Sequence, residues 1–114
     1  MKISYDKRKF ISATNSASGD VGAETVFHYH QDGEIVWAEY AGGNIVFGTL
    51  IAKAGDDDSL DMRYQHLNTD GELMTGVCTS TPELLPDGRL RLHEKWQWIS
   101  GDLSSGESII EEII

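Results

Sequence analysis

Four short segments that each combine a turn glycine, a polar residue and then an aliphatic residue recur along this chain. They are Asp32-Gly33-Glu34-Ile35, Gly42-Gly43-Asn44-Ile45, Asp70-Gly71-Glu72-Leu73 and Asp87-Gly88-Arg89-Leu90. Asp-Gly and Gly-Gly pairs between apolar segments are typical of hairpin turns, because glycine adopts a positive φ without a steric penalty. These turns constrain the chain to consecutive antiparallel strands.

The segments between the turns alternate apolar and polar residues with period two and are rich in β-branched and aromatic residues. They predict eight strands, at 8–14, 23–31, 34–41, 44–53, 60–67, 72–80, 89–99 and 107–113. The last segment also fits a final helical turn. Eight strands joined by hairpins form an up-and-down meander, and closing it removes both sheet edges. The sequence therefore predicts an all-β fold, an eight-stranded antiparallel barrel, with residues 1–114 as one domain.

The charge balance and the cysteine count narrow the functions to consider. Lys and Arg number 9 and Asp and Glu number 19, so the formal charge is -10. Such a surface repels phosphate backbones and anionic lipid, and no apolar run approaches the ~18 residues of a membrane span. The first residues lack the apolar stretch of a signal peptide. The lone Cys78 excludes an internal disulfide, so we expect a soluble, cytoplasmic protein without nucleic-acid or membrane partners.

The strand predicted at 89–99 gives the most specific signal. Alternation puts Leu90, Leu92, Glu94, Trp96 and Trp98 on one face, and charged or polar residues on the other. The first face is therefore the interior one. Burial disfavours the charged form of a carboxyl, so the pKa of Glu94 should rise. We expect its carboxyl to be hydrogen-bonded to Tyr64, His66 or a tryptophan N–H.

The strand predicted at 60–67 repeats this pattern, with Leu60, Met62, Tyr64 and His66 on the interior face. Apolar walls with a few converging polar groups are typical of ligand cavities. The candidate ligand-binding residues are Trp37, Tyr64, His66, Glu94, Trp96 and Trp98. The alternative is a packed core, in which tryptophan and tyrosine satisfy their polar ends internally.

A His-x-His pair, His28 and His30, suggests a second kind of site. Two imidazoles on one face of a strand can chelate a metal. Together with Gly22 and Glu34, the spacing resembles the first motif of cupin metal barrels. The motif's closing glycine falls on Ala41, and the second cupin motif has no counterpart. The alternative is that both histidines face solvent, since Phe27 and Tyr29 are better core residues.

Five segments of the chain resemble a family of small bacterial proteins, most of them uncharacterised. They are Asn15-Ser16-Ala17-Ser18-Gly19, Gly42-Gly43-Asn44-Ile45, Arg63-Tyr64-Gln65-His66, Gly71-Glu72-Leu73-Met74-Thr75-Gly76 and Glu94-Lys95-Trp96-Gln97-Trp98. The resemblance covers nearly the whole chain and implies an avidin-like or lipocalin-like barrel. Members sometimes carry the label N-acetylglutamate synthase. That acetyl-CoA chemistry needs a glycine loop opening a helix, and the sequence predicts no helix.

The remaining motifs predict no catalytic residue, no cofactor and no metal ligand set. Cys78 lies mid-strand without an activating base, and no serine lies in a nucleophile elbow. The run Asp56-Asp57-Asp58 lacks calcium-loop spacing and is expected to be a solvated turn. Three hypotheses follow: a barrel that binds a small molecule, a cupin-type metal barrel, and a structural module. For the last, either Val36, Ala38 and Tyr40 or the alternating Ile35 and Trp37 would face a second copy in a homo-oligomer.

Overall fold

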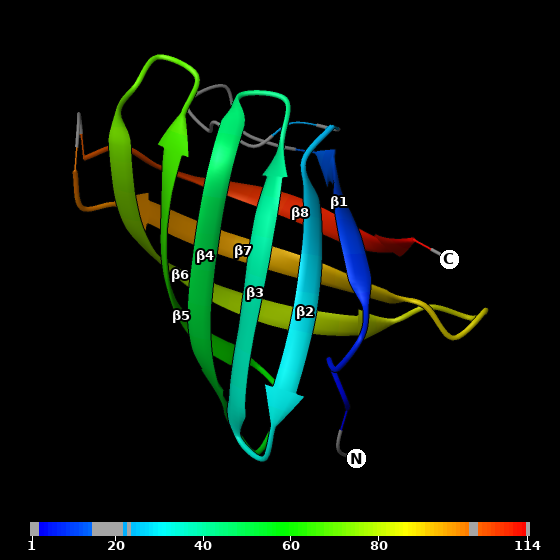
Figure 1. The fold of residues 1–114 in the computed structure, drawn as a ribbon. Coiled ribbons are helices and arrows are strands. Elements are labelled where there is room, and N and C mark those ends of the chain that lie inside the picture. The colour runs from blue at the N-terminus through cyan, green and yellow to red at the C-terminus, as the bar shows by residue number, and fades with distance from the viewer. Residues whose placement is uncertain (1–2, 15–21, 23, 101–102, 114) are drawn as a thin grey trace.

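The computed structural model describes residues 3–14, 22, 24–100 and 103–113 and shows a closed antiparallel barrel (Figure 1). Each strand pairs with the next along the chain, and β1 pairs with β8 to close the wall. The strands are β1 (Lys9–Thr14), β2 (Val26–Asp32), β3 (Ile35–Gly42), β4 (Ile45–Ala54), β5 (Leu60–Asn68), β6 (Leu73–Leu84), β7 (Leu90–Trp98) and β8 (Ser105–Ile113). The predicted fold is confirmed, and its last segment is the closing strand rather than a helical turn.

The predicted hairpin turns are present, and each has a glycine at positive φ. Gly33 has a φ of 61° and Gly71 one of 79°. An added Cβ would meet no atom within 4 Å at either position, so the backbone angle alone requires glycine there. Within the described part of the chain there is no helix of the length and apolarity needed to cross a membrane.

Strand β6 differs most from its predicted bounds. It was expected to end at residue 80, before Pro82, and it continues to Leu84. Ser80 pairs with Leu60, the first residue of β5, so the residues that follow pair only with β7. Pro82 therefore lies at a free strand edge, where its missing N–H breaks no ladder. The resulting β6–β7 hairpin extends beyond the barrel wall (Figure 1).

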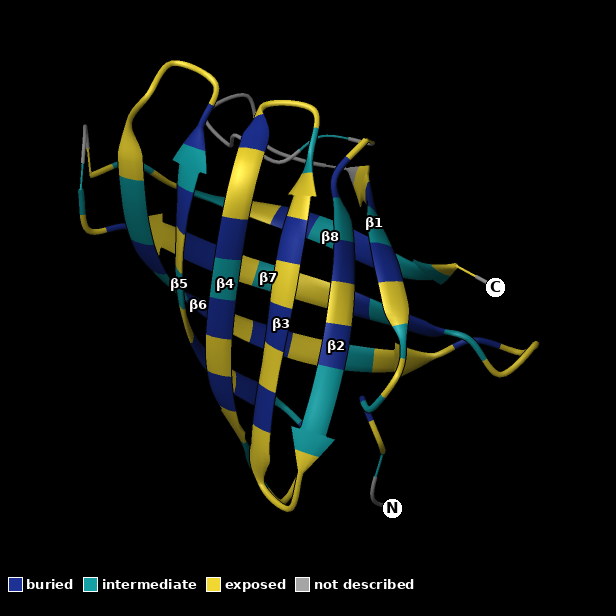
Figure 2. Ribbon diagram, viewed as in Figure 1, coloured by how far each residue is buried: buried dark blue, intermediate teal, exposed yellow. Residues whose placement is uncertain are grey.

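Burial follows the strand alternation, and buried and exposed residues alternate along the strands (Figure 2). Apolar side chains fill one half of the interior. We call this the apolar half; it lies toward the β2–β3 and β4–β5 turns. Its fully buried members are Tyr5, Phe10, Val36, Leu60, Leu90 and Leu92, each 0% exposed. These side chains leave no accessible surface, so this half of the interior is a packed core.

The segment before β1 is hydrogen-bonded to this end of the barrel. Ile3 N–H donates to Asp58 Oδ1 over 3.1 Å, and the Tyr5 hydroxyl donates to the Asp58 carbonyl. Tyr5 N–H donates to Gln31 Oε1 over 2.7 Å. The expectation that residues 56–58 form a wholly solvated turn is wrong for Asp58, which is buried. Its carboxylate accepts a backbone N–H from a segment 55 residues away, which no local pattern indicates.

Candidate functional site

Aromatic side chains gather in the other half of the interior, toward the β3–β4 and β5–β6 turns. We call this the aromatic half. The ring of Trp98 meets those of Tyr64, His66 and Trp96 with centroids 5.5, 5.4 and 5.8 Å apart. His66 in turn meets Tyr40 edge-on at 5.7 Å, and its Nδ1 lies 2.9 Å from the Tyr40 hydroxyl. Two strands, β5 and β7, thus bring four of the predicted site residues into one cluster, and β3 adds Tyr40.

Two glycines on β4 and β6, the strands on either side of β5, make room for these rings. Gly48 lies between Tyr40 and His66 in the strand pairing, and Gly76 lies between Tyr64 and Trp98. A Cβ at Gly48 would overlap the ring of Tyr40, and a Cβ at Gly76 would overlap the phenol of Tyr64. Each glycine therefore lets an aromatic side chain lie flat across its strand and touch a ring two strands away.

Glu94 points into the barrel where the apolar and aromatic halves meet, between Leu92 and Trp96 on β7. Ser80, its cross-strand neighbour, donates its hydroxyl hydrogen to Glu94 Oε2 over 3.2 Å. Burial raises the pKa of Glu94 to about 7, and the Ser80 hydrogen bond opposes this. The expected partners, Tyr64, His66 or a tryptophan N–H, are wrong. The hydroxyl directly across the ladder is nearer than any aromatic donor.

Tyr29 and Cys78 complete the polar surroundings of Glu94. Tyr29 is 1% exposed, and among the described residues its hydroxyl has no hydrogen-bond partner. Burial raises the pKa of Tyr29 and of Cys78, and the charge of Glu94 raises both further. The thiol is a small buried side chain, as expected. A phenol, a thiol and a carboxyl from three strands therefore share one region of the interior.

The two halves of the interior differ in how much of their surface a water molecule can touch. The large side chains of the apolar half are closed to water, and only Ile3 and Ala54 at its end are partly exposed among its described core residues. In the aromatic half Tyr64, Met74 and Glu94 keep part of their surface accessible although they point inward. Burial nevertheless dominates the pKa of Glu94, so its carboxyl lies deep among protein atoms. Glu94 also lines a hollow of about 380 Å³ together with exposed residues of β6 and β7, such as Thr81 and His93.

Trp37 and the candidate metal ligands lie outside the barrel. Trp37 is 39% exposed and stacks on His30 at 5.5 Å. His30 Nε2 also pairs with Glu39 at 2.8 Å, while His28 and Glu34 are exposed. Phe27 and Tyr29 take the inward positions of β2, so both histidines face outward. Among the described residues no three His, Cys, Asp or Glu side chains come together, so the cupin-type donor set is not assembled there.

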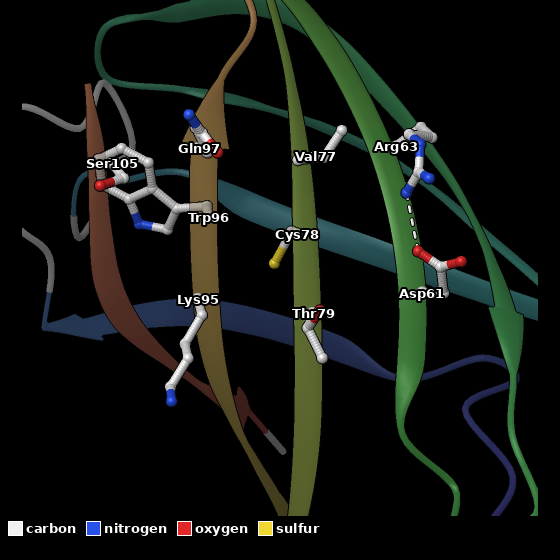
Figure 3. A pocket seen from close by; sticks show the side chains of 9 residues that line it. All are labelled: Asp61, Arg63, Val77, Cys78, Thr79, Lys95, Trp96, Gln97 and Ser105. Atoms are coloured by element: carbon white, nitrogen blue, oxygen red, sulfur yellow. Dashed lines mark hydrogen bonds and ion pairs between the residues drawn. The ribbon is translucent and has the colours of Figure 1, made fainter. Parts of the chain in front are cut away.

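The outer wall over β5–β8 carries a groove of about 390 Å³ (Figure 3). Its rim holds Arg63, Thr79, Lys95 and Gln97, and its floor includes Trp96 and Cys78. Arg63 is already paired with Asp61 at 2.7 Å. The polar side chains that could bind a ligand here are Thr79, Lys95, Gln97 and Ser105, on an exposed face. The groove therefore lacks the enclosed apolar lining typical of small-molecule sites.

Sequence reasoning missed three residues of the interior site: Tyr29, Tyr40 and Ser80. Alternation did put Tyr29 in the core, but nothing local showed that its hydroxyl lacks a partner. The sequence left open which of the two alternating faces of β3 lies inside. Tyr40 belongs to the inner face, and it pairs with Gly48 across the strand ladder. A signal for Ser80 was present, since serine is unusual among apolar neighbours on an inward face.

The fold and this interior define a class: a closed eight-stranded antiparallel barrel with an apolar half, an aromatic half and one inward carboxyl. A family model described as avidin-like protein matches residues 3–113, so the chain belongs to the avidin-like protein family. The fold that the sequence resemblance implied is confirmed. Neither curated proteins nor solved structures gave a significant match to the chain.

Proposed function

We propose that the protein binds a small molecule in the aromatic half of its barrel. The observation that carries the proposal is the contrast within the interior. The large core side chains of the apolar half are fully buried, whereas Tyr64, Met74 and Glu94 keep accessible surface. The buried, unpaired phenol of Tyr29 packs against the Phe10 ring and is close enough to Glu94 for its charge to act on it. A core meant only for stability would satisfy that hydroxyl, since an unmade buried hydrogen bond costs about 1–3 kcal/mol. A ligand with a polar group would supply the missing partner.

The proposed binding residues are Tyr29, Tyr64, His66, Glu94, Trp96 and Trp98. The rings supply flat apolar surfaces, and the carboxyl and hydroxyl fix the orientation of the ligand. Membership of an avidin-like family supports the proposal at the level of fold. Trp37 is not part of the proposed site, because it lies on the outer wall.

The experiment uses the three tryptophans, of which one is outside and two are inside. A Trp37→Phe variant leaves emission from Trp96 and Trp98 only. We expect that a screen of small aromatic compounds with this variant finds saturable changes in emission, and that Trp96→Ala weakens the binding detected by calorimetry. If no compound changes the emission of the Trp37→Phe variant, the interior does not bind ligands of this kind.

We further propose that the protein is cytoplasmic and forms a homo-oligomer through the outer face of β3 and β4. The single buried cysteine supports the location. On that outer face Ile35 is 54% exposed, and the cross-strand pair Trp37 and Ile51 is 39% and 58% exposed. Apolar surface of this kind favours contact with a second copy. Sedimentation should show a dimer or larger species that Ile51→Glu dissociates; a concentrated wild-type monomer would contradict this.

A further inference from the structure

The charges of the described interior are one-sided. Glu94 is an acid at the boundary between the two halves, and no Lys or Arg side chain of the described strands turns into the interior beside it. Arg8, a partly buried basic residue, lies at the apolar end and pairs with Glu112 at 2.6 Å. The protein therefore gives a buried carboxyl one neutral hydrogen bond, from Ser80, and no cation.

Next to this carboxyl lie groups that suit a positive charge. The Tyr29 hydroxyl can accept a hydrogen bond and has no described partner. Trp96 follows Glu94 by two residues on the same face of β7, and its ring contacts that of Trp98. Indole rings attract cations through their faces, most strongly where water is excluded. A carboxylate, a vacant acceptor and two indoles form a combination that favours ammonium groups over carboxylates.

We propose that the ligand of the barrel interior is a small organic cation, with its ammonium group hydrogen-bonded to Glu94 and its apolar body against Trp96 and Trp98. This proposal rests on the proposed function and names the chemical class of that ligand. The cation supplies the counter-charge that the described interior lacks. It also permits Glu94 to stay ionised at a depth where burial otherwise favours the protonated acid.

The net charge of the whole chain also favours a cationic ligand over an anionic one. A formal charge of -10 draws cations toward the molecule and repels anions. An anionic ligand would place a second negative charge beside Glu94 in a poorly solvated space, which is unfavourable unless the carboxyl takes up a proton. Uncharged ligands lose only the ion pair and keep the aromatic contacts.

The test compares three probes with the same ring and different charge: phenethylamine, 2-phenylethanol and phenylacetate. Calorimetric titrations at pH 8 are made with the wild type, with Glu94→Gln and with Glu107→Gln. The last variant removes the same charge from the exposed wall of the neighbouring strand β8. We expect phenethylamine to bind most tightly to the wild type. Glu94→Gln should weaken it roughly tenfold or more, the loss of a charge-assisted hydrogen bond, and Glu107→Gln should change it less than twofold.

The outcomes separate the two proposals. Phenylacetate or 2-phenylethanol could bind as tightly as phenethylamine, with binding that Trp96→Ala weakens. The interior would then bind ligands, but the proposal that the ligand is a cation would be wrong. Equal loss of amine affinity in Glu94→Gln and Glu107→Gln would mean that general surface charge attracts the amine, which also overturns the cation proposal. If none of the probes binds and the Trp37→Phe screen is empty, the proposed function itself fails. Thermal melting of Glu94→Gln shows that the variant is folded.

Discussion

The Ser80 hydroxyl donates to Glu94 Oε2 over 3.2 Å, across the β6–β7 ladder and inside the barrel. One neutral donor compensates little of the cost of burying a charge, so the pKa of the carboxyl stays high, at about 7. The protein therefore keeps an ionisable carboxyl in its interior although burying it lowers the folding stability. Groups kept at such a cost are more often functional than structural.

The first prediction concerns the pH dependence of stability. The pKa of Glu94 is about 7 in the folded protein against 4.5 as the ordinary value, so the folded state holds the proton more tightly. The contribution of this proton to the free energy of unfolding is fully present below about pH 4.5 and is lost as the pH rises through 7. The loss is at most about 3 kcal/mol, because Glu94 retains some contact with water. Urea unfolding at pH 5 and pH 8 should show this loss in the wild type and a smaller one in Glu94→Gln.

The comparison isolates Glu94 because the two proteins differ only at this residue. Ion pairs lower the pKa values of Glu83 and Asp87, so their contributions change below about pH 4.5. At pH 8 Glu94→Gln should be more stable than the wild type. Equal slopes of stability against pH in the two proteins would show that Glu94 is ionised without cost.

The second prediction concerns the donor. Ser80→Ala removes the one hydrogen bond that favours the ionised carboxyl, so the pKa of Glu94 should rise further. At pH 8 the variant should lose about 1–3 kcal/mol of unfolding free energy, and at pH 5 it should lose less. Thr79→Ala, on the exposed face of the same strand, is the control and should change stability by under about 0.5 kcal/mol. A loss that is equal at both pH values would assign the effect of Ser80 to packing.

The third prediction concerns the fastening of the N-terminal segment. Asp58 has a φ of 67°, which asparagine tolerates and alanine does not, and its carboxylate accepts the Ile3 N–H. Asp58→Asn should therefore cost less than about 1 kcal/mol, whereas Asp58→Ala should cost about 2 kcal/mol or more. Tyr5→Phe should lose about 1 kcal/mol with its hydrogen bond to the Asp58 carbonyl. Thermal unfolding measures all three, and identical values for the two Asp58 variants would contradict the role of the backbone angle.

The fold could be predicted from the sequence because its signals are local. Turn glycines and period-two alternation act over a few residues, so they located eight strands and the inward face of β7. The site was predicted only in part, because its decisive contacts join distant residues. The pairing of Tyr40 with His66 depends on the register around Gly48, and the exposure of Trp37 depends on which face of β3 the barrel encloses. Asp58 shows the same limit, since its partner lies 55 residues away.

The fourth prediction tests the glycine that seats the aromatic half. Gly48 has an ordinary backbone angle, and its added Cβ would overlap the Tyr40 ring and lie 2.8 Å from the Cβ of His66. Gly48→Ala should therefore push these two side chains apart and cost about 1–3 kcal/mol. Because the apolar half is untouched, the variant should still fold.

Binding and stability should separate in this variant. The displaced Tyr40 and His66 rings lie against Trp98 and its neighbours, so any probe that changes interior tryptophan emission should bind more weakly to Gly48→Ala. Gly22→Ala is the matched control, because a Cβ there meets no atom within 4 Å and the φ is not in the left-handed region. We expect it to match the wild type in melting temperature and in probe affinity. A stable Gly48→Ala variant with unchanged emission would mean that the rings adjust without loss and that the glycine does not determine the shape of the site.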